Sequence, residues 1–131
     1  MNSLTIIAVA SGGAIGATLR LFINTIVNKN FIYTLPLGTL VVNLLGSLLI
    51  GIFFAYFHLN SSLSPHLKTF LTTGMLGALT TYSTFAMESF FLLESGDYVH
   101  AFANMLLNLF GTILFAGIGY MTLLHFTKGN F

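Results

Sequence analysis

The stretch Gly74-Met-Leu-Gly-Ala-Leu-Thr-Thr-Tyr-Ser-Thr84 places two glycines and four serine or threonine residues in the middle of an otherwise apolar segment, residues 66–93. A continuous helix facing lipid gains nothing from that composition. Inside a bilayer, the backbone leaves helical geometry only where protein or a water-filled cavity satisfies its N–H and C=O groups. A break here would place carbonyls and helix ends near the midplane, as in the ion sites of transporters. The alternative is a straight helix whose hydroxyls bond to the preceding turn, and the pattern leaves both open.

Three further apolar segments surround this one, at residues 4–27, 37–57 and 99–126. The whole chain is 56% hydrophobic and 5% charged, a balance at which a water-soluble domain lacks enough polar side chains for its surface. A membrane crossing needs about 20 apolar residues, so four crossings and short connections use up the chain. We therefore expect a single all-α integral membrane domain over residues 1–131, with both termini on one side. There are no cysteines, which excludes thiolate metal sites and disulfides.

The basic residues are balanced across the expected membrane. Lys68 and Lys128 fall on the side of the termini, whereas Arg20 and Lys29 fall on the other. Lysine and arginine in short loops set the orientation of a membrane protein, so two against two gives no bias. Such a chain can insert in both orientations, and oppositely oriented copies can pair about a twofold axis in the membrane plane. The alternative is a weak preference set by other features.

Polar residues recur inside the expected spans. Asn43 lies in an apolar segment, where an unsatisfied amide would cost a few kcal/mol, so it must face protein or water. Asn104, Asn108 and Thr112 are spaced by four residues and form one polar stripe along a helix. These groups either bond neighbouring helices together or line a narrow hydrophilic path.

Aromatic and charged residues follow the glycine-rich stretch. Tyr82, Phe85 and Glu88 recur at intervals of three residues and share one helix face with Ser89. An aromatic face is usually core, but the positive edges of such rings can also accompany a partly dehydrated anion. Glu88 is an intramembrane carboxylate and hence a functional candidate. Arg20, near the end of the first segment, either reaches the interface or attracts anions.

Smaller features agree with a helical membrane bundle. Pro36 and Pro65 precede or begin expected helices, with Ser64 as an N-cap. Small residues in the first two segments allow close helix packing, and these are Gly12, Gly13, Gly16, Ala17, Gly46, Ser47 and Gly51. The histidines all fall near segment ends, without metal-ligand spacing.

Three stretches together resemble the Fluc/CrcB family of bacterial fluoride channels, over essentially the whole chain. The most specific is Gly74-Met-Leu-Gly-Ala-Leu-Thr-Thr-Tyr-Ser-Thr-Phe85, followed by Glu88. The others are Gly12-Gly-Ala-Ile-Gly-Ala-Thr-Leu-Arg20 and Gly38-Thr-Leu-Val-Val-Asn-Leu-Leu-Gly-Ser47. The resemblance implies passive fluoride export that relieves fluoride toxicity, in the inner membrane.

The resemblance further implies four transmembrane helices with a broken third helix, in an antiparallel dual-topology homodimer with two fluoride pores. A structural sodium ion at its centre would be held by backbone carbonyls, which map to Gly77 and Thr80. The amide of Asn43 and the ring edges of Tyr82 and Phe85 would bind fluoride, with tyrosine where phenylalanine is frequent in the family. The fluoride path is then expected to involve Arg20, Asn43, Tyr82, Ser83, Thr84, Phe85, Glu88, Asn104, Asn108 and Thr112.

Other function classes fit the residues less well. A small multidrug-exporter-like, proton-coupled antiporter relies on a carboxylate deep in the first helix, and this chain has none there. A structural subunit of a larger membrane complex would use the polar residues only to join helices. An enzyme is not expected, because no nucleophile–base pair or metal cluster is apparent. The sequence contains no basic patch of the kind that binds nucleic acid. The expected partners are fluoride, sodium, lipid and a second copy of the chain.

Overall fold

The computed structural model describes residues 2–31 and 34–128, and all regular elements in these ranges are helical. This confirms the all-α class. The elements are α1 (Ser3–Asn30), α2 (Leu37–Leu59), α3 (Pro65–Thr69), the π-helical segment η1 (Phe70–Leu76), α4 (Gly77–Leu79), α5 (Tyr82–Glu94), α6 (Tyr98–Leu106), the π-helical segment η2 (Leu107–Gly111) and α7 (Thr112–Lys128).

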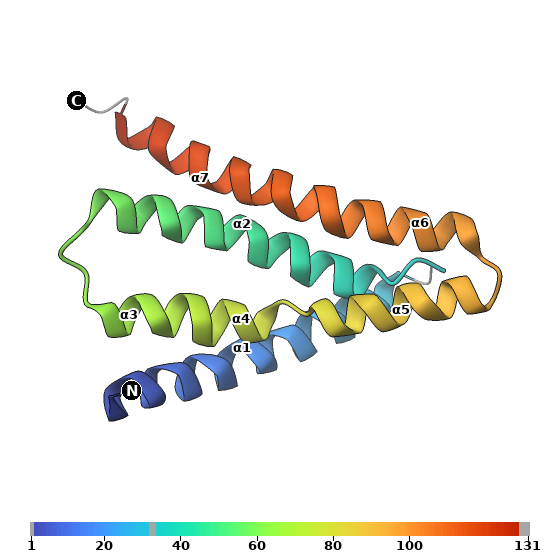
Figure 1. Ribbon diagram of the computed structural model, residues 1–131, viewed down its shortest axis with the longest axis horizontal. Coiled ribbons are helices and arrows are strands. Elements are labelled where there is room, and N and C mark those ends of the chain that lie inside the picture. The colour runs from blue at the N-terminus through green and yellow to red at the C-terminus, as the bar shows by residue number, and fades with distance from the viewer. Residues whose placement is uncertain (1, 32–33, 129–131) are drawn as a thin grey trace.

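The elements join into long rods that lie side by side. The first is α1 and the second is α2; the third runs from α3 to α5, and the fourth from α6 to α7. Figure 1 shows the rods alternating in direction, with the start of α1 and the end of α7 at the same end as the connection between α2 and α3. The connection between α5 and α6 lies at the opposite end. The first and last helices therefore begin and end at the same end of the molecule, which agrees with the expectation that both termini share one side.

In the part of the chain that the structure describes, three helices are long and apolar enough to cross a membrane, namely Ser3–Asn30, Leu37–Leu59 and Tyr98–Thr127. The rod from α3 to α5 supplies none of that length because Thr80 and Thr81 divide it. Within the described residues the buried apolar core consists of only six side chains, whereas many large apolar side chains, such as Leu21 and Phe22, are exposed. An outer surface of this kind suits lipid or a partner and not water. The chain is a multi-pass membrane protein.

Polar side chains begin the helices of the third and fourth rods. Ser64 accepts a hydrogen bond from the Leu67 N–H at 3.2 Å, and Pro65 is the first residue of α3, which confirms the expected cap. Asp97 caps α6 by accepting from the His100 N–H at 3.2 Å. The His100 ring also hydrogen-bonds the Asp97 carboxyl and holds the pKa of that carboxyl below its ordinary value. These caps fix where the rods leave the connecting loops.

Glycines let the rods approach backbone to backbone. A Cβ atom added to Gly12 or Gly16 of α1 would collide with carbonyl oxygens of η1. A Cβ added to Gly51 of α2 would likewise collide with the backbone of α7, and one added to Gly119 of α7 would collide with the backbone of α2. The expected packing role of Gly12, Gly16 and Gly51 is confirmed. Membrane helices associate by such close contact because lipid gives apolar side chains little reason to prefer protein.

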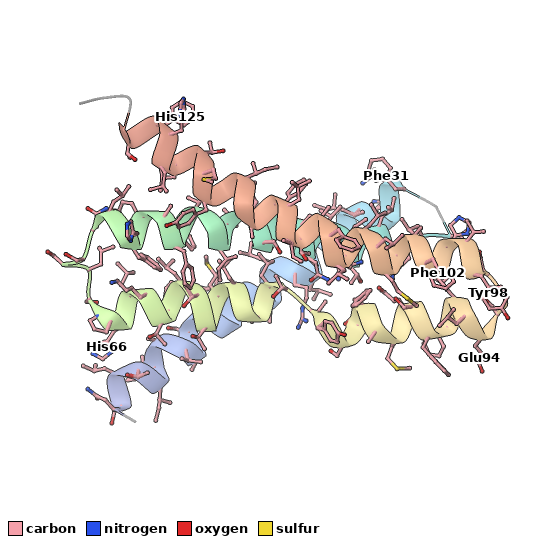
Figure 2. All side chains as sticks on the ribbon, turned by 45° about the horizontal axis from the view of Figure 1, so that its top comes forward. Phe31, His66, Glu94, Tyr98, Phe102 and His125 are labelled. Atoms are coloured by element: carbon pink, nitrogen blue, oxygen red, sulfur yellow. The ribbon has the colours of Figure 1, made fainter. Side chains whose placement is uncertain are left out.

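Polar and amphipathic side chains lie at the two ends of the rods. Figure 2 shows His66 and His125 at the end that holds both termini, and Glu94 and Tyr98 at the opposite end. His58 lies in the last turn of α2. Such side chains suit the boundary between lipid and water, which is the role the sequence suggested for the histidines.

Candidate functional site

Two residues, Thr80 and Thr81, join α4 to α5 through extended backbone. Thr80 has ψ 157°, and Thr81 has φ −149° and ψ 109°. The Thr81 hydroxyl caps α5: it accepts from the Thr84 N–H at 3.3 Å and donates to the Thr84 hydroxyl at 2.8 Å. The Thr80 hydroxyl donates to the Leu76 carbonyl of the preceding turn at 3.0 Å. The stretch therefore has extended backbone, as expected for a break, and also a hydroxyl that donates to the carbonyl four residues earlier, as expected for a continuous helix.

The side chain of Asn43, on α2, holds this connection in place. Its Oδ1 accepts from the Thr81 N–H at 2.8 Å, and its Nδ2 donates to the Thr81 carbonyl at 3.2 Å. Asn43 and Thr81 are 7% and 6% exposed, so both bonds are largely buried. A planar amide thus pairs with both polar groups of one extended residue, as a neighbouring strand would. Asn43 satisfies backbone that the helix no longer satisfies.

A chain of buried amides continues from Asn43 into the fourth rod. Asn43 Nδ2 donates to Asn108 Oδ1 at 2.8 Å, and Asn108 Nδ2 donates to both the backbone oxygen and the Oδ1 of Asn104 at 3.0 Å. Asn104 Nδ2 donates in turn to the Ser89 hydroxyl at 3.0 Å. Asn104 is completely buried, and Ser89 and Asn108 are nearly so. Asn104 and Asn108 of the polar stripe are therefore hydrogen-bonded to α5 and α2, whereas the Thr112 hydroxyl donates to the Asn108 and Leu109 carbonyls of its own rod.

A cavity of about 530 Å³ lies beside the helix connection. Its walls come from α2, from both sides of the connection and from the fourth rod. Seven of the residues expected at the ion sites line it, namely Asn43, Gly77, Thr80, Tyr82, Phe85, Asn108 and Thr112. No charged side chain is among the residues that line it. The cavity thus offers amides, hydroxyls, carbonyls and aromatic rings to an ion.

Tyr82 and Phe85 form an edge-to-face pair in the wall of the cavity. Their ring centroids are 5.3 Å apart and the ring planes meet at 69°. Tyr82 is 79% exposed, although it lies close to the middle of the third rod. Ring edges carry positive potential, so a pair in this geometry can turn an edge toward an anion.

Two backbone carbonyls at the connection lack their usual helical donors. In a continuous helix, the Thr81 N–H would bond to the Gly77 carbonyl and the Thr84 N–H to the Thr80 carbonyl. Here the Thr81 N–H donates to Asn43, and the Thr84 N–H donates to the Thr81 hydroxyl. Both Gly77 and Thr80 line the cavity. Carbonyl oxygens in this position suit a hard monovalent cation, so the residues present fit a sodium ion.

Other expected site residues lie outside this cavity. Ser83 and Thr84 are exposed at the start of α5. Glu88 lies farther along α5, where its Oε1 accepts from the Thr39 hydroxyl at 2.7 Å. Its Oε2 is buried and has no hydrogen-bond partner among the described residues. Arg20 is half-buried and stands about three turns before the end of α1, which extends to Asn30, beyond the expected end at residue 27.

The sequence pattern gave no role to Thr39, and it indicated only that Ser89 shares a helix face with Tyr82 and Phe85. Each lies four residues from a recognised position on the same helix: Thr39 precedes Asn43, and Ser89 follows Phe85. Residues four apart share a helix face, so that spacing was the available signal. Which partner each hydroxyl meets depends on how the rods pack.

Comparisons with known proteins place this arrangement in a family. A family model described as "CrcB-like protein, Camphor Resistance (CrcB)" matches residues 7–120. A protein named fluoride-specific ion channel FluC from Sulfurimonas denitrificans is 54% identical over 120 residues, covering 92% of this chain and 93% of the relative. Proteins of the same name from Campylobacter jejuni and Nautilia profundicola are 49% and 47% identical, and cover 89% and 88% of this chain and 95% and 91% of their own.

Proposed function

This chain belongs to the family of CrcB-like proteins, and we infer that it is a fluoride-selective ion channel and not an enzyme. The relatives that carry the name of fluoride channel match nearly its full length. Within the site, the observation that supports this best is that Asn43 and the Tyr82–Phe85 pair line one and the same cavity. Such an arrangement supplies hydrogen-bond donors and positive ring edges, which an anion needs when it sheds water.

Selection of fluoride follows from the size and hydration of the ion. Fluoride is small and strongly hydrated, so a dry apolar slot would reject it, whereas a wide wet pore would also admit chloride. A narrow path with amide, hydroxyl and ring-edge donors can replace water around the smaller ion only. The first rod has no acidic side chain to couple transport to protons. Flux through such a path is passive, and in the inner membrane it would export fluoride and relieve its toxicity.

The functional unit is a dual-topology homodimer of two antiparallel copies. The cavity is open in a single copy, and Tyr82 is largely exposed beside it, so the site is incomplete without further protein. The basic residues that set orientation balance at two on each side. A second, inverted copy would bring the same residues to the cavity about a twofold axis and complete two pores.

Added lysines should abolish activity by forcing one orientation. Ser61→Lys with Ser62→Lys adds two lysines to the exposed connection between α2 and α3, and Glu94→Lys with Ser95→Lys adds two lysines at the opposite end. Each double variant alone should lose fluoride flux, whereas co-expression of the two should restore it. Flux in vesicles and labelling of each loop from outside would be measured together. Full activity from a uniformly oriented population would rule out the inverted dimer.

Sodium is proposed as a structural ion at the centre of that dimer. The carbonyls of Gly77 and Thr80 would hold it, and a second copy would supply the same two oxygens about the axis. No carboxylate lines the cavity, which favours a monovalent over a divalent ion. When bound, the ion supplies a positive charge at the dimer centre.

Replacement of Gly77 should weaken the dimer and leave the single chain folded. A Cβ at Gly77 meets only the Thr72 carbonyl, at 3.5 Å, which is ordinary contact. The single chain should therefore still fold. The branched side chain would nevertheless disturb the helix connection that carries the proposed sodium ligands, so Gly77→Val should reduce the dimer fraction in detergent. Replacement of sodium by a bulky organic cation should do the same. Thr80→Ser should have a mild effect because the proposed ligand is the backbone oxygen. An equally stable dimer after exhaustive sodium removal would show that sodium has no structural role.

A further inference from the structure

The orientation of every amide in the chain from Asn43 to Ser89 is set by its neighbours. The Thr81 N–H can only donate, so Asn43 must turn its oxygen toward it and its nitrogen toward Asn108. Asn108 must then present its oxygen to Asn43 and its nitrogen to Asn104. The backbone oxygen of Asn104 can only accept, which agrees with that orientation from the other side. The bonds from Asn43 to Asn108, from Asn108 to Asn104 and from Asn104 to Ser89 therefore all run in one direction, away from the helix connection, while the second Asn43 proton goes back to the Thr81 carbonyl.

In this arrangement Asn43 has no unused donor. Its NH₂ group carries two protons, and these are taken by the Thr81 carbonyl and by Asn108 Oδ1. A fluoride ion that binds the Asn43 amide must therefore displace one of the two bonds. The two bonds to Thr81 are made by one planar group to one residue, so losing one by rotation of the amide also strains the other. The bond to Asn108 can be given up while the pairing with Thr81 remains.

The position of Asn108 suits such an exchange. Asn43 and Asn108 both line the cavity, so an ion inside the cavity can reach the bond between them. Asn108 is held from its other end by two hydrogen bonds to Asn104, which keep its oxygen pointed at Asn43. Within the described residues, Asn43 supplies the single hydrogen bond that Asn108 Oδ1 accepts. The Asn108 oxygen and fluoride thus compete for one N–H.

We propose that Asn108 is a positioning residue that latches the Asn43 amide, so that the Asn43–Asn108 bond sets the fluoride concentration at which the pore half-fills. This inference rests on the proposed function, because it takes Asn43 to be a fluoride donor. It differs from a pore-lining role for Asn108: the residue acts through Asn43 and opposes ion entry. Loss of the latch should ease fluoride binding, whereas loss of a pore-lining donor should weaken it.

The test measures initial fluoride flux into liposomes over a range of fluoride concentrations. Asn108→Leu removes the competing oxygen, and Asn108→Ser shortens the side chain so that it no longer reaches Asn43. For both, the half-saturating fluoride concentration should fall by about three- to tenfold, the equivalent of one uncharged hydrogen bond. Asn108→Asp keeps an acceptor at the same place, so its half-saturating concentration should stay at or above that of the wild type.

A matched control is Phe110→Leu, in the same π-helical segment, where the side chain is 61% exposed and does not line the cavity. Its half-saturating concentration should stay within about twofold of the wild type. A purely structural role for Asn108 predicts that all three Asn108 variants lose maximal flux alike. If the half-saturating fluoride concentration is unchanged or raised in both Asn108→Leu and Asn108→Ser, the latch is overturned. Fluoride flux through the wild type would in that case still support the proposed channel. Absence of flux in the wild type would overturn the proposed function and the latch with it.

Discussion

Replacement of Asn43 by leucine is expected to reduce fluoride flux by about 10- to 150-fold, because a hydrogen bond to a charged partner contributes about 1.5–3 kcal/mol. Leucine has a similar size but offers no donor to an ion in the cavity. It also leaves the Thr81 N–H and the Asn108 oxygen without the partner they have in the structure. The flux should be measured with a fluoride electrode on liposomes that contain equal amounts of folded protein.

The fraction of folded dimer separates the donor role of Asn43 from its structural role. Each buried group left unsatisfied costs about 1–3 kcal/mol, so thermal stability of the Asn43→Leu variant should fall as well. Val41→Leu is the control, since Val41 lies on the exposed face of the same helix. If flux per folded dimer is unchanged in Asn43→Leu, Asn43 only joins helices.

A single methyl group at Gly16 is expected to destabilise the folded chain strongly. The Cβ of Gly16→Ala would overlap the Met75 carbonyl group and approach the Leu79 N–H nitrogen at 3.1 Å. These are backbone atoms of η1 and α4, which cannot turn aside as a flexible side chain can. Overpacking typically costs about 1–3 kcal/mol, and α1 would have to shift along its whole contact with the third rod. Size-exclusion chromatography in detergent should show aggregate in place of dimer.

The matched control for this prediction is Gly13→Ala. Gly13 lies on the same helix, and a Cβ there meets no atom of the described residues within 4 Å. Alanine also favours helix over glycine by about 1 kcal/mol, so the folded chain should be as stable as the wild type or more so. A Gly16→Ala dimer with wild-type stability would show that the contact between α1 and the third rod is looser than the structure has it.

The helices were predictable from the sequence because long apolar runs leave few alternatives in a membrane. Expected and observed bounds agree within a few residues, and Ser64 with Pro65 marked the start of α3 correctly. The end of α1 was placed too early, since residues 28–30 are polar and hydropathy alone gives no reason to continue the helix. As a result, Arg20 was expected nearer the helix end than the structure places it.

The residues of the site were also visible, but their partners were not. A lone amide in an apolar helix and a polar stripe of period four each require a buried partner, so Asn43 and Asn108 could be selected. That these two bond each other depends on the angle and depth at which α2 and the fourth rod pack, which are set by the close approach of Gly51 to α7 and of Gly119 to α2. The direction of the amide chain follows from the Thr81 N–H. This N–H is free of a helical hydrogen bond only because the extended backbone falls at Thr80 and Thr81. Composition indicated that any extended backbone would fall within residues 74–84, and in the structure it falls at Thr80 and Thr81.

The central claim, that this chain forms a passive fluoride-selective channel, is tested most directly by purified protein in liposomes. Fluoride and chloride efflux should be recorded with ion-selective electrodes under the same potassium-driven membrane potential, and then with a pH gradient at clamped potential. We expect rapid fluoride efflux down its gradient, little chloride efflux, and no uphill fluoride movement driven by the pH gradient. Equal chloride and fluoride efflux would contradict selectivity, and uphill fluoride accumulation driven by protons would contradict a channel.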